Sequence, residues 1–538
     1  MTEHKQNERI YLFDTTLRDG QQTAGVDFSV KDKILIAQLL DELGLDYIEG
    51  GYPGANPTDT QFFSDSYGLK NARKTAYGMT KKIGRSADND PGLAMVLNAE
   101  AEAVCLVAKS WDYHVDIALG ISNEENLDAI KESVQAIIAR DKEAMIDCEH
   151  FFDGYKNNRD YALQCAVAAT EAGARWIVLC DTNGGTMPDE IYDIVQAVTK
   201  HVPGARLGIH AHNDTENAVA NSLAAVQAGV RQVQGTLNGL GERCGNANMV
   251  SLIPTFLLKA AFVDAFTTGI SADNLQQLTI ASRRLDDILN YTPNRRQPYV
   301  GDSAFAHKGG IHVSAVMKDP ATYEHIKPEL VGNTRKILVS NQAGRSNILA
   351  RLEHAGIDPK GNDEAVQQIL SQVKEKEQAG YSFDNAGASF ELLAREIFGK
   401  LPLFFEVESY QVNVHHQGGA LEDSVATAQV RLKIDGESLT TRGTGNGPIN
   451  ALDMALRADL RRYAPYLADL RLVDYKVRIL NTGTAAVTRV VIESADSEGR
   501  SWRTIGVSEN VVAASFRALH DAIIFKLLRS GVSATADG

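Results

Sequence analysis

Two short polar stretches, far apart in the chain, carry side chains that could bind a metal ion. The first contains Arg18 and Asp19, and the second contains His210 and His212. Each stretch follows an apolar run that predicts a β-strand, so each is expected where a strand ends in a loop. Residues two apart at a strand end point to the same face, so the two imidazoles should lie together. Two histidines and an aspartate suit a divalent metal and leave coordination positions open for a substrate.

The two histidines could instead be held by hydrogen bonds at the edge of a sheet, without a metal. An isolated His-x-His pattern does not decide between these interpretations. The placement of polar residues after most of the predicted strands favours the metal site.

The strands that would position these loops belong to a repeating pattern. Short runs rich in β-branched residues alternate with amphipathic helical patterns, and the predicted strands cover residues 10–14, 46–51, 74–78, 103–108, 144–150, 175–181, 206–212 and 231–236. In the first helical segment Ser29 can cap the N-terminus, apolar residues recur at helical spacing from Ile36 to Leu43, and Gly44 can end the helix. Eight such units predict a (β/α)8 TIM barrel. An open doubly wound sheet usually has fewer strands and a Gly-x-Gly-x-x-Gly turn, which does not follow the first strand here.

Polar residues collect at the ends of six of the eight predicted strands. They are residues 14–19 after the first strand, Glu49 after the second, Asp147 and Glu149 after the fifth, residues 181–183 after the sixth, His210 and His212 after the seventh, and residues 238–246 after the eighth. In a barrel of this type, the loops at the C-terminal ends of the strands build the active site. The pattern therefore predicts one active site on this rim.

Three domains are predicted: the barrel over residues 8–275, helical connecting subdomains over 276–402, and a C-terminal α+β domain over 403–530. In the connecting region, glycine and proline clusters interrupt helical patterns, and a dense polar block contains His307 and His312. A helix-rich linker with incidental histidines is the alternative interpretation of that block.

The C-terminal domain shows a third pattern. Polar and apolar residues alternate over 410–414 and 426–434, as they do in half-buried antiparallel strands, and a helical pattern begins at Pro448. Strands near 473–479, 486–492 and 502–507, followed by a helix carrying residues 512–523, repeat this order. The pattern favours a duplicated β-rich unit with one helix in each half.

Composition limits the class of protein. A chain of 538 residues with 44% apolar and 23% charged residues is typical of a globular protein of several domains. The net charge of -15 argues against a nucleic-acid or anionic-membrane partner. No run approaches the roughly 18 apolar residues of a membrane helix, and no secretory signal is recognised. The five cysteines are scattered, mostly within apolar runs, so we expect reduced thiols that fill the core of a cytoplasmic protein.

A metal held by Asp19, His210 and His212 beside Arg18 would suit an anionic substrate whose oxygen must be polarised. An α-keto acid fits, because its keto and carboxylate oxygens can chelate the metal. The metal would then be a Lewis acid, and Arg18 could stabilise negative charge on the oxygen. These groups favour formation or cleavage of a carbon–carbon bond beside a carbonyl.

Three motifs, at residues 14–21, 210–214 and 239–246, resemble the acyl-CoA-condensing branch of the DRE-TIM metallolyases. This branch holds the isopropylmalate, homocitrate and citramalate synthases, and the similarity covers nearly the whole chain. Residues 50–57 and 149–155 are most similar to the longer citramalate synthases. The region from residue 403 resembles the domain through which isopropylmalate and citramalate synthases dimerise and bind an amino acid end product.

The resemblance implies a role for each candidate site residue. The metal ligands would be Asp19, His210 and His212, with Asn246 as a further or water-mediated contact; Arg18 would lie over the reacting carbonyl, Thr182 would bind the substrate carboxylate, and Glu149, His312 and Tyr323 would transfer protons. The metal could be Mn, Mg, Co or Zn. Related acyl-CoA lyases carry a reactive cysteine at the loop position of Cys244, but the flanking Arg243 and Gly245 follow the synthase pattern, so we expect Cys244 to be structural.

The expected reaction is therefore metal-dependent condensation of acetyl-CoA with pyruvate to (R)-citramalate and CoA, in isoleucine biosynthesis. Isopropylmalate synthesis from 2-oxoisovalerate and homocitrate synthesis are close alternatives. A lyase that runs the reverse cleavage has less need of a C-terminal duplicated domain, and an inactive amino-acid-binding regulator has no need of an intact metal set. A homodimer with isoleucine or leucine as effector is expected.

Overall fold

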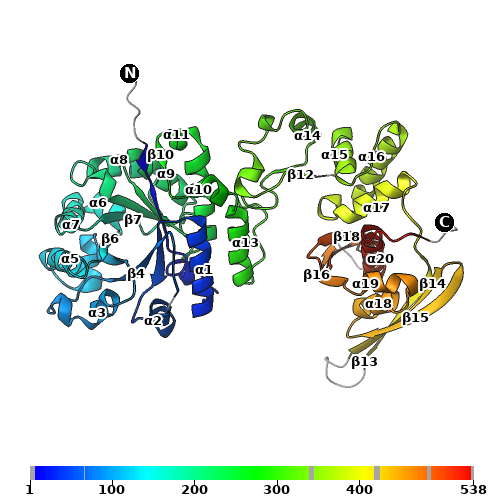
Figure 1. Ribbon diagram of the computed structural model, residues 1–538, viewed down its shortest axis with the longest axis horizontal. Coiled ribbons are helices and arrows are strands. Elements are labelled where there is room, and N and C mark those ends of the chain that lie inside the picture. Colours follow the sequence, from blue (N-terminus) through cyan, green and yellow to red (C-terminus); the bar gives the residue numbers. More distant parts are fainter. Residues whose placement is uncertain (1–6, 66, 339–343, 417–423, 481–485, 535–538) are drawn as a thin grey trace. The chain divides into compact units, whose positions relative to one another are not determined.

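The computed structural model describes residues 7–65, 67–338, 344–416, 424–480 and 486–534. The chain forms two compact units (Figure 1). The first unit contains Met1–Phe305 and Ile326–Thr334, and the second contains Ala306–His325 and Arg335–Gly538. This division by compactness does not test the three predicted domain boundaries, which stay a prediction.

Eight parallel strands close into a barrel in the first unit (Figure 1), which confirms the predicted fold class. They are β2 (Tyr11–Asp14), β3 (Tyr47–Gly51), β4 (Arg73–Met79), β5 (Ala103–Lys109), β6 (Glu143–Glu149), β7 (Trp176–Asp181), β8 (Leu207–Ala211) and β9 (Gln232–Gly235). The first and last strands pair in register, with Tyr11 opposite Gln232, so the barrel has no open edge. All eight strands lie where the sequence predicts them.

Helices form an outer layer around these strands (Figure 1). The longer ones are α1 (Val30–Leu43), α2 (Pro57–Ser64), α3 (Pro91–Leu97), α5 (Asn123–Ile138), α6 (Phe151–Asn157), α7 (Arg159–Glu171), α8 (Pro188–Val198), α9 (Ala218–Ala228) and α10 (Met249–Leu258). Helix α1 begins as predicted, because the Ser29 hydroxyl accepts a hydrogen bond from the backbone N–H of Asp32. It ends at Gly44, whose φ of 95° is left-handed backbone that glycine adopts without strain.

Alternate residues of the strands build two separate cores. Leu12, Val104 and Ile177 belong to the large core between strands and helices. The neighbouring residues on the same strands point to the opposite face and form an inner cluster: Phe13, Tyr47, Ala103, Cys105, Met145, Trp176, Val178 and Cys180. The interior of the barrel is thus packed, and the polar strand ends lie beyond it.

Four cysteines are buried and free, namely Cys105, Cys148, Cys165 and Cys180. They fill the core as the sequence predicts. Cys244 is exposed, so that prediction is wrong for this one residue. It lies in a polar loop after the last barrel strand, where no core is available.

The first unit also contains elements outside the barrel strands and the helices between them. Strands β1 (Glu8–Arg9) and β10 (Phe266–Thr267) pair in parallel, and helices α4 (Asp112–His114), α11 (Ala260–Val263), α12 (Ala272–Leu275) and α13 (Leu278–Ile288) complete it. Among the described residues, no helix is both long and apolar enough to cross a membrane.

The second unit begins with a mostly helical part. Strands β11 (Ala306–His307) and β12 (Lys336–Ile337) form a short parallel pair, and the helices are α14 (Gly310–Val316), α15 (Arg345–His354), α16 (Asp363–Gln378) and α17 (Gly387–Ile397). These helices agree with the helical connecting region predicted from the sequence.

Two antiparallel sheets follow, each with a helix after its last strand. The first has β13 (Glu406–His416), β14 (Ser424–Ile434), β15 (Glu437–Gly445) and α18 (Pro448–Arg457); the second has β16 (Arg471–Ile479), β17 (Thr488–Ala495), β18 (Ser501–Ser508) and α20 (Val511–Arg529). The short α19 (Ala464–Leu467) lies between them in the chain. The predicted duplication is confirmed.

Candidate active site and metal centre

Asp19, His210 and His212 come together as the sequence predicts. Their possible ligand atoms all lie within 4.8 Å of one another, and all three residues are buried. The Asp19 Oδ2 atom lies 3.2 Å from His210 Nε2 and 3.8 Å from His212 Nε2, and the two Nε2 atoms are 3.4 Å apart. Three nitrogen and oxygen atoms that converge in this way can coordinate one divalent cation.

The charges of these groups favour a cation. Burial disfavours a charged Asp19, but the guanidinium of Arg18 and the two imidazoles hold its pKa well below the usual range, so it is a carboxylate. Burial and the neighbouring His210 lower the pKa of His212 to about 4, so this imidazole is neutral at pH 7. A neutral imidazole has the lone pair that a metal requires.

His210 is oriented by Gln234, a residue that the sequence does not single out. His210 Nδ1 lies 2.8 Å from Gln234 Oε1, which accepts its hydrogen bond, and His210 Nε2 faces Asp19 Oδ2 at 3.2 Å, where a cation can take the place of a proton. The Gln234 amide is itself fixed, because its Nε2 donates to Asp147 Oδ1 at 3.1 Å. Gln234 lies on β9. The alternation of residues between the two faces of that strand is the one sequence feature that could have indicated where its side chain points.

The side chain of Asn246 offers a fourth possible metal ligand. It pairs with His212 in an isolated β-bridge and is 2% exposed. Its Nδ2 donates to the carbonyl of Leu240 at 3.2 Å, whereas its Oδ1 is buried without a hydrogen-bond partner among the described residues. Buried polar atoms are normally satisfied, so an unpaired amide oxygen beside the triad fits a cation or a water bound to it.

Arg18 is fixed in place by its neighbours. Its Nε donates to Glu49 Oε2 at 2.7 Å, its Nη1 lies 3.3 Å from Asp19 Oδ2, and its guanidinium lies over the ring of Tyr77, 4.1 Å from the centroid. Thr15 also donates to the same Glu49 oxygen, at 2.6 Å. The sequence reasoning missed both Glu49 and Tyr77 as partners of Arg18. A charged group held on several sides is suited to stabilising a developing oxyanion.

Glu149 and Thr182 lie at the C-terminal ends of β6 and β7, on the same rim. Glu149 forms an ion pair with Lys109. The Thr182 hydroxyl oxygen accepts a hydrogen bond from the backbone N–H of His150 at 2.9 Å, which leaves its own proton available to a substrate. His150 has a φ of 55°, so this contact fixes a backbone conformation that is uncommon outside glycine.

His312 and Tyr323 belong to the second unit. His312 lies on α14 and Tyr323 follows the short 3-10 helix η6 (Pro320–Thr322); their rings stack with centroids 4.3 Å apart. The structure therefore brings these two candidates together. The buried Glu324 next to Tyr323 accepts hydrogen bonds from both Nε and Nη2 of Arg335, each at 2.6 Å, and lies 3.0 Å from His307 Nε2.

The loop that carries Cys244 is tied to the loop after β8. Arg243 donates to both carboxylate oxygens of Asp214, at 2.8 and 2.9 Å, and to the carbonyl of Thr182 at 2.7 Å. These bonds connect the loops of the last three barrel strands. A structural role for Cys244 stays a prediction.

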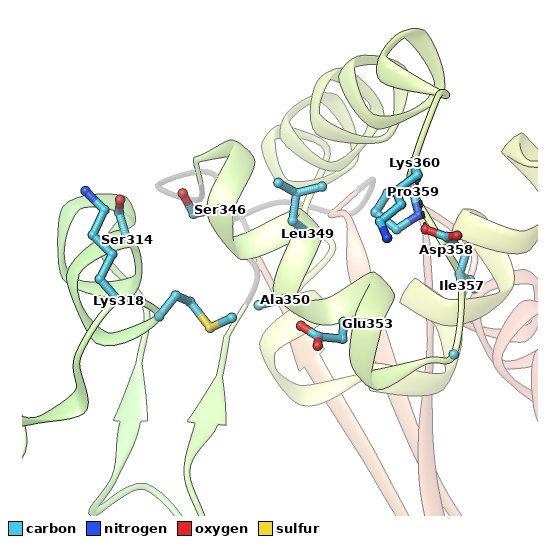
Figure 2. A pocket seen from close by; sticks show the side chains of 12 residues that line it. Ser314, Lys318, Ser346, Leu349, Ala350, Glu353, Ile357, Asp358, Pro359 and Lys360 are labelled. Carbon is cyan, nitrogen blue, oxygen red and sulfur yellow. Dashed lines mark hydrogen bonds between the residues drawn. The ribbon is translucent and has the colours of Figure 1, made fainter.

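A cavity of about 660 Å³ lies beside α14 and α15 in the second unit (Figure 2). Figure 2 shows Ser314 and Lys318 on one side of it and Leu349 and Glu353, from α15, on another. A molecule bound there would contact the helix that carries His312.

Family models match three parts of the chain. An HMGL-like model matches residues 9–279, a homocitrate synthase post-HMGL domain-like model matches 299–380, and a LeuA allosteric (dimerisation) domain model matches 385–527. The first match covers the closed barrel and every barrel residue of the candidate site. The chain belongs to the HMGL-like family.

Curated relatives extend this finding over nearly the whole length. The chain is 49% identical to the (R)-citramalate synthase of Aquifex aeolicus and 48% identical to that of Geobacter sulfurreducens, and each alignment covers 97% of this chain and 98% of the relative. It is 32% identical to a probable 2-isopropylmalate synthase of Methanopyrus kandleri, over 95% of this chain and 97% of the relative. The resemblance to the citramalate synthases, indicated by the sequence motifs, is confirmed.

Proposed function

We propose that this chain condenses acetyl-CoA with pyruvate to give (R)-citramalate and CoA, as a step of isoleucine biosynthesis. The observation that carries the proposal is the buried set of Asp19, His210 and His212, beside Arg18, in a chain 49% identical to an (R)-citramalate synthase. Four buried free thiols support a cytoplasmic location, where cysteines stay reduced.

The reaction joins the methyl carbon of acetyl-CoA to the keto carbon of pyruvate, and water then releases CoA from the thioester. Asp19, His210, His212 and the amide oxygen of Asn246 would hold a divalent cation (Mn, Mg, Co or Zn), which when bound supplies a Lewis acid for the keto oxygen. Arg18 would stabilise negative charge that develops on the same oxygen.

Thr182 would bind the pyruvate carboxylate. Its oxygen already accepts a hydrogen bond from His150, so its hydroxyl proton can be donated to the substrate. This contact would orient the keto carbon toward the acetyl group, and correct orientation lowers the barrier of a bimolecular step.

Proton transfer is assigned to three residues. A base must remove a proton from the acetyl methyl group, and an acid must protonate the new alkoxide. We propose Glu149, His312 and Tyr323 for these roles, because Glu149 lies on the barrel rim and the other two form a stacked, partly exposed pair, with Tyr323 46% exposed.

The protein is proposed to be a homodimer through its C-terminal sheets, with an amino acid as feedback effector. Strands β13 and β16 are edge strands, and they expose large apolar side chains: Val414, Val473, Val477 and Ile479. Exposed apolar edge strands are normally covered by a partner. The match to the LeuA allosteric (dimerisation) domain supports the same role. Isoleucine is the expected effector of a citramalate synthase, and leucine that of an isopropylmalate synthase.

The test is CoA release from acetyl-CoA, followed with a thiol reagent, in the presence of pyruvate, 2-oxobutyrate, 2-oxoisovalerate or 2-oxoglutarate. The highest kcat/KM is expected with pyruvate. A preference for 2-oxoisovalerate would favour the alternative, a 2-isopropylmalate synthase like the Methanopyrus relative. A preference for 2-oxoglutarate would favour a homocitrate synthase.

Two further outcomes would contradict a synthase. Cleavage of an acyl-CoA without net condensation would indicate a lyase. Absence of CoA release with any keto acid, combined with binding of isoleucine or leucine, would indicate a regulator that has lost the barrel activity.

A further inference from the structure

Lys33 is a fully buried lysine in the first turn of α1. Its side chain is 0% exposed. Its ammonium donates to the carbonyl of Leu17 at 2.8 Å and to the carbonyl of Gly50 at 3.0 Å, and it forms an ion pair with Asp59. All three N–H groups of the ammonium therefore have an acceptor.

An apolar residue would be expected at this position. Lys33 lies three residues before Ile36 and seven before Leu40, on the face of α1 that packs against the barrel. Burial lowers the pKa of Lys33, and Asp59 opposes that change, so the charge is costly to bury and is kept by its partners. Buried ion pairs often contribute less to stability than well-packed apolar side chains. The position of its acceptors points to another role.

Both carbonyl acceptors border active-site residues. Leu17 directly precedes Arg18 and Asp19, and Gly50 directly follows Glu49, the carboxylate that holds Arg18. One ammonium thus connects the loop after β2 with the end of β3.

Asp59, the third partner of the Lys33 ammonium, also binds the backbone that follows β3. Its Oδ2 accepts a hydrogen bond from the backbone N–H of Tyr52 at 2.9 Å. It lies directly against Gly51, whose φ is 137° and where an added Cβ would lie 2.4 Å from the Asp59 carboxyl carbon. The carboxylate is therefore packed beneath the turn after β3, and Lys33 cannot shift without moving that turn.

We propose that Lys33 is a positioning residue, which sets the placement of Asp19 and Arg18 relative to Glu49 and so controls metal affinity and keto-acid turnover without touching either ligand. The catalytic part of this inference rests on the proposed function; the metal part rests only on the triad.

The test compares Lys33→Met and Lys33→Arg with the wild type. Binding of Mn²⁺ alone is measured by calorimetry, and kcat and KM for pyruvate are measured by CoA release. Lys33→Met is expected to bind Mn²⁺ about tenfold more weakly and to lose about 10²-fold in kcat, because outer-sphere partners of metal ligands typically contribute 10- to 100-fold. Lys33→Arg keeps the charge and is expected to recover part of both losses.

Lys526→Met is the matched control. Lys526 is 4% exposed and pairs with Asp469 and Asp496 in the second unit, so its loss also breaks a buried ion pair. Its variant is expected to lose thermal stability with unchanged Mn²⁺ affinity. A folded Lys33→Met protein with unchanged Mn²⁺ affinity and kcat would overturn the proposal, whatever its melting temperature.

A variant that keeps the lysine covers the case in which Lys33→Met does not fold. Asp59→Asn preserves the two carbonyl acceptors and removes only the ion pair, and it is expected to weaken Mn²⁺ binding severalfold. Wild-type Mn²⁺ affinity in a folded Asp59→Asn protein would also overturn the proposal. Because Mn²⁺ binding is measured without substrate, an error in the proposed reaction would appear in CoA release and leave this result intact.

Discussion

At the scale of single residues, the candidate metal centre depends on a chain of hydrogen bonds that reaches across the barrel. Asp147 accepts a hydrogen bond from the amide of Gln234, and Gln234 accepts one from His210 Nδ1. His210 Nε2 in turn lies 3.2 Å from Asp19 Oδ2. Each member defines the orientation of the next, so contacts within the protein hold the ligand geometry. Such preorganisation increases affinity because less ordering is needed on binding.

Replacement of a histidine ligand should therefore remove the metal and leave the fold intact. His212→Ala and His210→Ala are expected to abolish turnover and to lower metal content, since each removes one of the two imidazole ligands of the candidate site. Metal content by mass spectrometry and circular dichroism would be measured together. A metal-free His212→Ala protein with full activity would contradict the metal assignment.

Arg18→Lys should be severely impaired although the charge is kept. Arg18 uses its planar fork to contact Glu49 and Asp19 at once and lies over Tyr77, and a lysine ammonium cannot reproduce these contacts. Loss of one oxyanion donor typically costs about 10² or more in kcat. A decrease in kcat below about threefold would show that Arg18 has no role in stabilising the oxyanion.

At the scale of elements, Glu324 holds together the short segments around Tyr323. Two hydrogen bonds from Arg335 and the proximity of His307 keep the pKa of Glu324 below its usual value, although burial opposes this. A depressed carboxylate pKa contributes stability that is present above the ordinary value of 4.5 and is lost as the pH falls below it.

Glu324→Gln should lower the stability of the second unit at pH 7 by about 1 to 3 kcal/mol, the usual cost of an unsatisfied buried partner. The difference from wild type should shrink as the pH falls below 4.5, because the wild-type carboxylate is then protonated too. Urea unfolding at several pH values would measure this. Glu364→Gln, at an exposed position on α16, is the control. A difference independent of pH would show that the Glu324 charge is not involved.

The elements were predictable where their signals are local. The strands and the Ser29 and Gly44 ends of α1 follow from periodicity and capping preferences of neighbouring residues. Gln234 and Glu324 could not be recognised, because their partners come from other segments and periodicity does not report such contacts. Lys33 left one signal, a charged residue on the apolar face of a predicted helix. The candidate metal triad was predictable because His210 and His212 are two apart at one strand end and Asp19 follows the end of another strand.

At the scale of the whole molecule, the proposed dimer can be tested on strand β16. Val477 and Ile479 are two apart on this edge strand, so they share one face, and they are 46% and 67% exposed. Glutamates at both positions should give a monomer, because burying two carboxylates in an apolar interface is unfavourable. Light scattering would measure the mass. Leu35→Glu, at an exposed position on α1, is the control and should not change the mass.

The chain passes between the two units more than once, and this affects the order in which a new molecule becomes competent. The first unit, in which β9 pairs with β2 to close the barrel, is complete once Ile326–Thr334 have been synthesised. Residues 306–325, which carry His312 and Tyr323, belong instead to a unit completed by residues from Arg335 onward. Since domains generally fold as units during synthesis, a nascent chain would be able to capture a metal ion before its last two proton-transfer candidates are ordered.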